Sequence, residues 1–110
     1  MNVIIKVTRN CNLRCNYCNE WRNKKKVMDI EVLANTISKV LNCSNTQSVN
    51  FIWHGGEPLL CGQEYYKKIL YIQQKCNKRN VQISNSIQTN GVLLNKSWIE
   101  FCKKYDFDVG

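Results

Sequence analysis

Two kinds of hydrophobic pattern alternate along the chain. Short runs rich in β-branched and aromatic residues predict buried strands, and they fall at residues 3–7, 49–54, 81–89 and 107–109. Between these runs, apolar residues recur at spacings of three and four, which predicts helices with one apolar face. Polar residues that can cap a helix, Asp29 and Asn95, precede the first and third helical patterns. The sequence therefore predicts three strand-helix units and the start of a fourth strand.

Each predicted helix has a set of apolar residues that would face a sheet. In the first helix, which should end near Asn42, they are Ile30, Leu33, Ile37, Val40 and Leu41. In the second they are Tyr65, Ile69, Ile72 and Cys76. In the third they are Trp98, Phe101, Cys102 and Tyr105. Because cysteine packs as a small apolar residue, we expect Cys76 and Cys102 to serve the core.

The repeat of strand and helix is typical of parallel α/β architecture. A doubly wound sheet and a barrel of βα units both fit this order. In both folds, ligands bind beyond the carboxyl ends of the strands. Three unusual stretches follow the first three predicted strands, and they read CNLRCNYC, HGGEP and QTNG. We therefore expect these three loops to form one site.

The length of the chain limits how much of such a fold it can form. A complete βα barrel takes roughly 250 residues, whereas this chain has 110. We therefore expect a partial parallel TIM-like barrel, about half of a complete one, with three βα units and the beginning of a fourth strand. Such a half barrel would leave one strand edge and part of the inner face open.

Charge and composition exclude few classes of function. The net charge of +8 suggests nucleic-acid binding, but the basic residues are dense only at 22–26, so this interpretation is not favoured. No apolar run is long enough to span a membrane, and the first residues do not resemble a secretory signal. The odd number of cysteines, seven, favours reduced thiols and a cytoplasmic protein.

The first loop carries three closely spaced cysteines, Cys11, Cys15 and Cys18. Thiolates at this spacing suit zinc or an iron–sulfur cluster. A structural zinc site needs a fourth ligand, and His54 is the only histidine, so a site of three cysteines and one histidine is one alternative. A [4Fe–4S] cluster on the three cysteines would leave one iron without a protein ligand, as a catalytic site requires.

The stretch CNLRCNYC resembles the CxxxCxxC cluster motif of the radical S-adenosylmethionine (radical SAM) enzymes, in which an aromatic residue, here Tyr17, precedes the third cysteine. HGGEP and QTNG follow in the order found in the subgroup of anaerobic sulfatase-maturating and other SPASM-type peptide-modifying enzymes. The resemblance implies that residues 1–110 are the amino-terminal portion of a radical SAM core domain. It also implies that a [4Fe–4S] cluster is held by Cys11, Cys15 and Cys18, and that its fourth iron binds S-adenosylmethionine.

The resemblance also implies which residues bind S-adenosylmethionine. Tyr17 would lie near the adenine, and the GGEP motif would meet the amino group of the methionine moiety through Gly55, Gly56, Glu57 and Pro58. Elementary chemistry agrees, because glycines allow a close approach, proline favours an extended residue before it, and a carboxylate can bind an amine.

The remaining polar loop residues have two interpretations each. His54 would contact the cofactor or cap its strand. Gln88, Thr89 and Asn90 would line the cavity or form a turn, in which Gly91 would take part. Cys61 follows HGGEP and could approach the site, although packing is the simpler interpretation.

The activity implied by the resemblance is reductive cleavage of S-adenosylmethionine to a 5′-deoxyadenosyl radical, which removes hydrogen from a peptide or protein. Flavodoxin or ferredoxin would supply the electron. No catalytic residue beyond the cluster ligands is assigned, and the later strands of the family's barrel carry further contacts. Two alternatives stay open, a non-catalytic zinc or iron–sulfur module and a radical SAM protein that modifies RNA.

Overall fold

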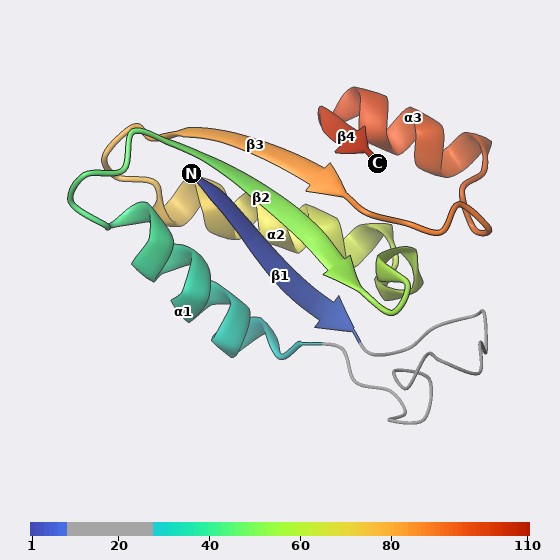
Figure 1. The fold of residues 1–110 in the computed structure, drawn as a ribbon, viewed down its shortest axis with the longest axis horizontal. Coiled ribbons are helices and arrows are strands. Elements are labelled where there is room, and N and C mark those ends of the chain that lie inside the picture. Colours follow the sequence, from blue (N-terminus) through green and yellow to red (C-terminus); the bar gives the residue numbers. More distant parts are fainter. Residues whose placement is uncertain (9–27) are drawn as a thin grey trace.

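The computed structural model describes residues 1–8 and 28–110, and residues 9–27 lie outside the described part. Strands and helices alternate as the hydrophobic pattern predicts (Figure 1). The elements are β1 (Asn2–Thr8), α1 (Ile30–Leu41), β2 (Ser48–Gly55), the short 3₁₀ helix η2 (Pro58–Cys61), α2 (Gln63–Cys76), β3 (Gln82–Ile87), α3 (Lys96–Lys104) and β4 (Phe107–Val109).

The four described strands form one parallel sheet in the order β1-β2-β3-β4. The arrowheads of β1, β2 and β3 point the same way, so the carboxyl ends of these strands lie at one edge of the sheet (Figure 1). A doubly wound sheet would reverse its strand order at a switch point, and no reversal occurs in the described sheet. The fold is therefore a partial TIM-like barrel, and the alternative of a doubly wound sheet is wrong.

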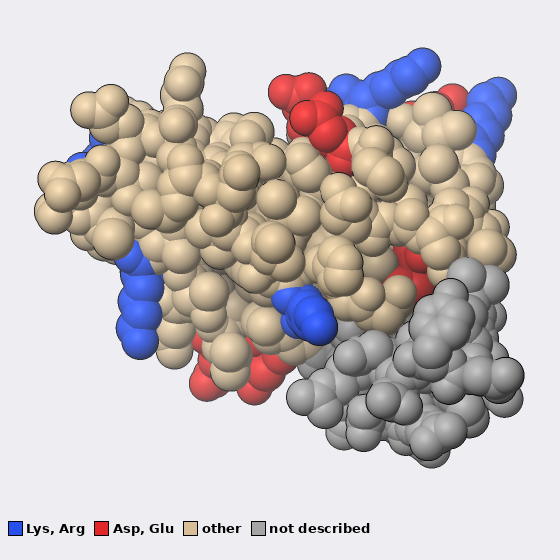
Figure 2. All heavy atoms as spheres, viewed as in Figure 1, with Lys and Arg blue, Asp and Glu red and all other residues tan. Residues whose placement is uncertain are grey.

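The two faces of the sheet differ in burial. Alternate residues of the strands are buried against the helices, among them Ile5, Val7, Phe51, Trp53 and Ile87. The opposite face is viewed in Figure 1, where α2 lies behind the strands. On this face, most of the Lys, Arg, Asp and Glu side chains of the described residues lie around the outline, and they form no continuous basic patch (Figure 2).

Two predicted caps hold the helices as expected. The Asp29 carboxylate accepts a hydrogen bond from the Glu31 N–H at 3.2 Å at the start of α1. The Asn95 side-chain oxygen accepts one from the Trp98 N–H at 2.9 Å at the start of α3. Each cap satisfies one of the N–H groups that a helix leaves unpaired at its first turn. Among the described residues, no helix has both the length and the apolar character needed to cross a bilayer.

The inner face of α2 differs from the predicted one. Tyr65 and Ile69 are buried as expected, and Ile72 and Cys76 are half-buried and pack against the core, as predicted. Tyr66 and Gln73 are buried as well, and Gln73 can occupy an apolar interface because it hydrogen-bonds to Asn85 on β3. Burial of a polar group is tolerated where its hydrogen bonds are satisfied.

The third strand is shorter than predicted, and one short helix was not predicted. β3 ends at Ile87 rather than at residue 89, because Thr89 and Asn90 form hydrogen bonds of a turn. The residues after Glu57 form η2, which begins with a proline. A proline suits the first position of a helix because its missing N–H would be unpaired there.

Candidate functional site

The carboxyl edge of the sheet brings together the ends of three segments. Thr8, the last residue of β1, is in register with Gly55, the last residue of β2. The Met28 N–H donates to the Val7 carbonyl at 2.7 Å, so residues on both sides of segment 9–27 meet at the end of β1. Four predicted site residues lie in that segment, outside the described residues, and they are Cys11, Cys15, Tyr17 and Cys18.

The backbone from Gly55 to Pro58 has the conformation that its residue types favour. Gly55 has a φ of 134°, in the region that residues with a side chain rarely adopt. Glu57 is extended, with φ −141° and ψ 101°, as predicted from the proline after it. The chain then turns into η2, and the Glu57 carboxylate accepts a hydrogen bond from the Leu59 N–H at 2.9 Å.

The Glu57 side chain is fully buried and joins this loop to the loop after β3. Its Oε1 accepts a hydrogen bond from the Asn90 N–H at 2.8 Å. The Thr89 hydroxyl lies 2.8 Å from Oε1 and 2.7 Å from Oε2, so it donates to the same carboxylate. Hydrogen bonds to a carboxylate are stronger than those between neutral groups, and here they connect residues 32 and 33 positions apart.

The loop after β3 also forms a turn of its own. The Thr89 hydroxyl accepts a hydrogen bond from the Gly91 N–H at 3.1 Å, and the Asn90 side-chain oxygen accepts one from the Val92 N–H at 2.9 Å. Gly91 has a φ of 85°, which agrees with its predicted role in the turn. Gln88 is exposed at the end of β3. Turn formation by Thr89 and Asn90 is thus observed, and cavity lining stays a prediction.

Helix α2 supports the same loop from the other side. The Tyr66 hydroxyl donates to the Pro58 carbonyl at 2.9 Å, and its ring makes edge contacts with Trp53, Trp98 and Phe107. Burial raises the pKa of the Tyr66 hydroxyl far above its usual range. The hydroxyl therefore keeps its proton at neutral pH and remains a hydrogen-bond donor.

The neighbouring Cys61 is half-buried and is not paired with another cysteine. Burial raises the pKa of its thiol to about 12; a hydrogen bond with Tyr66 acts in the opposite direction, and the Glu57 charge adds to the increase. A thiol that keeps its proton is a poor nucleophile and a poor metal ligand. In the described part of the protein, Cys61 packs against the hydrophobic core, which agrees with the simpler of its two interpretations.

His54 lies directly before Gly55, on the strand that ends at the site. It is in register with Lys6 of β1. Its Nδ1 atom is buried and makes no hydrogen bond to the described part of the protein. A buried polar atom without a partner is costly, so this atom has capacity to bind a further group. The other role predicted for His54 was to cap its strand, and Nδ1 forms no such hydrogen bond with the described residues.

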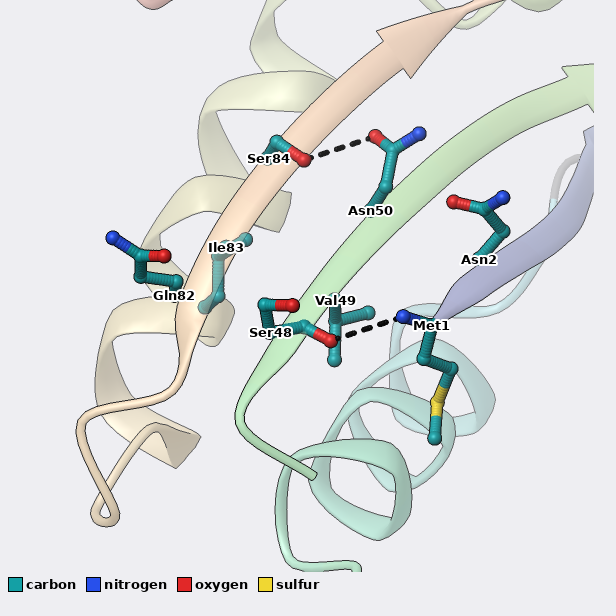
Figure 3. Close-up of a pocket in the computed structure, with 8 residues that line it drawn as sticks. All are labelled: Met1, Asn2, Ser48, Val49, Asn50, Gln82, Ile83 and Ser84. Atoms are coloured by element: carbon teal, nitrogen blue, oxygen red, sulfur yellow. Dashed lines mark hydrogen bonds between the residues drawn. The ribbon is translucent and has the colours of Figure 1, made fainter. Parts of the chain in front are cut away.

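A separate pocket lies at the opposite ends of the strands (Figure 3). It has a volume of about 400 Å³ and is lined by residues from the amino ends of β1, β2 and β3. The Met1 amino group donates to the Ser48 carbonyl at 3.3 Å, and the Ser84 hydroxyl donates to Asn50 at 3.1 Å (Figure 3). Because parallel strands place all their carboxyl ends at the other edge, this pocket is separate from the candidate site.

The sequence indicated the loops of the site but not the contacts between them. Nothing near Glu57 in the sequence points to Thr89, because the two residues meet only when β2 and β3 pair. The role of Tyr66 was also missed, although an aromatic residue with a polar tip, soon after Pro58, is a signal that could have suggested it. The capping of η2 by Glu57 could have been inferred from an acidic residue directly before a proline.

The partial barrel, with its candidate site at the carboxyl edge of the sheet, agrees with the family that the sequence comparison identifies. The family model described as the Radical SAM superfamily matches residues 5–109, so the chain belongs to this superfamily. Among its relatives, a cysteine-type anaerobic sulfatase-maturating enzyme of Clostridium perfringens is 41% identical over 107 residues. A serine-type enzyme of Klebsiella pneumoniae is 38% identical over 104 residues.

Solved structures agree with this relationship. The structure of native anSMEcpe with bound AdoMet and Cp18Cys peptide has a TM-score of 0.85 and 39% identity, and the match covers 99% of this chain and 30% of that one. The two enzymes named above are matched over 91% of this chain but over only 29% and 26% of their own lengths. The chain thus spans less than a third of the length of each of these three proteins.

The residues of the site fit the cofactors of this superfamily in two respects. First, thiolates are suitable ligands for iron, and Cys11, Cys15 and Cys18 would provide three of them. Second, the buried Nδ1 of His54 can accept or donate a further hydrogen bond. Within residues 1–8 and 28–110, no three His, Cys, Asp or Glu side chains are arranged to hold a metal. The alternative zinc site also uses residues of segment 9–27 and stays untested.

Proposed function

We propose that this chain binds a [4Fe–4S] cluster through Cys11, Cys15 and Cys18 and binds S-adenosylmethionine beside it. One observation carries this proposal. The Gly55–Pro58 loop is joined through Glu57 to Thr89 and Asn90 at the sheet edge where Val7 and Met28, on either side of the cysteine segment, meet. We further propose that residues 1–110 are the amino-terminal portion of a radical SAM core domain.

The cofactor site we propose combines residues from all three loops. It contains Tyr17, His54, Gly55, Gly56, Glu57, Pro58, Gln88, Thr89 and Asn90. The glycine backbone allows a ligand to approach closely, and His54 offers a buried Nδ1 without a described partner. When bound, the cluster and S-adenosylmethionine supply the one-electron chemistry, while the protein supplies binding and orientation.

The substrate we propose is a peptide or protein, with flavodoxin or ferredoxin as the electron donor. The relatives support the substrate class, because they include sulfatase-maturating enzymes and a structure with a bound peptide. We place the protein in the cytoplasm. The described cysteines support this, since all four are free thiols, as expected in a reducing compartment.

Anaerobic reconstitution with iron and sulfide tests the proposal. The protein should bind about four irons per chain, and the spectrum of the reduced cluster should change when S-adenosylmethionine is added. Changing Cys11, Cys15 or Cys18 to Ala should abolish stable cluster binding. The matched control is Cys102→Ala, because Cys102 is buried in the core. That variant should bind iron normally and lose about 1–2 kcal/mol of stability.

The reconstituted protein also distinguishes the proposed function from the zinc module and the RNA-modifying enzyme. A protein that binds one zinc and no iron would instead be the zinc module. Binding to RNA that weakens steeply with salt would favour an RNA-modifying enzyme. An unchanged reduced-cluster spectrum after addition of S-adenosylmethionine would refute the proposed cofactor.

A further inference from the structure

Both oxygens of the Glu57 carboxylate already accept hydrogen bonds from the protein. Oε2 accepts from the Leu59 N–H and Oε1 from the Asn90 N–H, and the Thr89 hydroxyl lies within hydrogen-bond distance of both oxygens. The side chain is 0% exposed. Because no part of the side chain is exposed, a direct contact between this carboxylate and a bound cofactor would require the protein atoms that cover it to move, and any of the three donors left unpaired by that movement would be costly.

We propose that Glu57 belongs to the cofactor site as a positioning residue: it connects two loops of the site and does not itself touch S-adenosylmethionine. We call its carboxylate and the three donors, Leu59 N–H, Thr89 hydroxyl and Asn90 N–H, the Glu57 clamp. The clamp holds the Gly55–Gly56 backbone in place at the edge of the sheet. The identity of the ligand rests on the proposed function, whereas the clamp itself is a property of the protein alone.

The clamp is needed because the two loops follow different strands. The hydrogen bond to Leu59 is local and fixes the start of η2, but the bonds to Thr89 and Asn90 cross from one loop to the other. On the opposite side, the Tyr66 hydroxyl holds the Pro58 carbonyl. The Gly55–Pro58 loop is therefore held by α2 on one side and by the loop after β3 on the other. Because the two glycines directly precede Glu57, the position of Glu57 also fixes the position of their backbone.

Amide hydrogen exchange on the cofactor-free chain tests the clamp directly. In Glu57→Gln the side chain keeps its shape but one oxygen becomes an NH₂ donor. Whichever way this amide is turned, either Leu59 or Asn90 loses its acceptor. We expect exchange at that N–H to become at least tenfold faster. Glu64→Gln is the matched control, because Glu64 is exposed and pairs with Lys67 at the surface, and exchange at Leu59 and Asn90 should be unchanged in this variant.

Affinity for S-adenosylmethionine, measured on the reconstituted protein by equilibrium dialysis, tests the positioning role. We expect about tenfold weaker binding in Glu57→Gln and in Thr89→Val, which removes the hydroxyl but keeps the size of the side chain. Thr89→Ser keeps the hydroxyl and should restore binding. Because both variants break the same set of bonds, the double variant should be little weaker than either single one.

The outcomes distinguish this inference from the proposed function. If Glu57→Gln weakens binding while Leu59 and Asn90 exchange as in the unmodified protein, Glu57 contacts the cofactor and the inference is wrong. It is also wrong if exchange accelerates but affinity is unchanged. If the unmodified protein does not bind S-adenosylmethionine, the proposed function fails, and the exchange data still decide whether the clamp exists.

Discussion

The indole Nε1 of Trp53 donates a hydrogen bond to the side-chain oxygen of Asn85 at 2.9 Å, on the face of the sheet that the helices cover. Gln73 of α2 donates to the same oxygen at 2.8 Å and accepts from the Asn85 Nδ2 at 3.2 Å. Asn85 is 6% exposed and Gln73 is 3% exposed. This buried network joins β2, β3 and α2 with specific geometry, in addition to the apolar packing around it.

The first prediction concerns that network. Asn85→Ala would leave the Trp53 N–H and both polar groups of Gln73 without partners in the core. We expect a loss of about 2–4 kcal/mol in the free energy of unfolding, measured by urea denaturation. Asn50→Ala is the control, because Asn50 accepts hydrogen bonds from serines on the uncovered face of the sheet. If both variants lost the same stability, burial of the network would not be the cause.

The second prediction concerns the end of α1. The Arg79 guanidinium donates to the carbonyls of Leu41, Cys43 and Ser44, where the helix ends and the chain turns. Arg79→Ala should cost about 1 kcal/mol. Arg79→Lys should recover little of it, because an ammonium cannot reproduce the planar fork of donors.

The matched control for Arg79 is Lys78→Ala, since Lys78 is its exposed neighbour. The free energy of unfolding of this variant, measured by urea denaturation, should change by less than about 0.5 kcal/mol. Full recovery of stability by Arg79→Lys would mean that charge alone, rather than the geometry of the hydrogen bonds, stabilises this end of the helix.

The third prediction concerns alkaline pH. The pKa of the Cys61 thiol is 9.0 in its reference state and is raised by burial to about 12 in the folded protein. Between these values the unfolded chain loses a proton that the folded chain keeps, so stability should fall as pH rises from 9 to 12. Below pH 9 both states are protonated and this contribution is fully present. Urea midpoints between pH 8 and 11 measure the slope.

Cys61→Ala should make that slope shallower without abolishing it, because burial also raises the pKa of Tyr65 and of Tyr66. Cys43→Ala is the control, since Cys43 is exposed. A slope that is identical in Cys61→Ala and in the unmodified protein would contradict the role given to this thiol.

The fourth prediction concerns the cap of α3. Asn95→Ala removes the oxygen that accepts from the Trp98 N–H and should cost about 1 kcal/mol. Asn95→Asp keeps an acceptor at this position, so thermal unfolding of that variant should occur close to the temperature of the unmodified protein. An equal decrease for both substitutions would show that the cap hydrogen bond contributes little.

Local features of the sequence predicted much of the fold. The caps at Asp29 and Asn95 and the extended Glu57 before Pro58 depend on residues only a few positions apart, and all three are found in the structure. Buried Gln73 was missed because its polar side chain breaks the apolar pattern of α2. A weak signal existed, since Asn85 lies between Ile83 and Ile87 on the same face of β3, where a polar residue needs a partner.

The sequence by itself determined the order and type of the elements and the three loops that follow the strands, because hydrophobic period, caps and turns act over a few neighbouring residues. Only the tertiary structure decided the strand order β1-β2-β3-β4 and the partners of Glu57. The hydrogen bonds that Glu57 accepts from Thr89 and Asn90 join residues more than thirty positions apart. Such contacts form only when neighbouring strands pair and helices pack on them, so no local pattern specifies them.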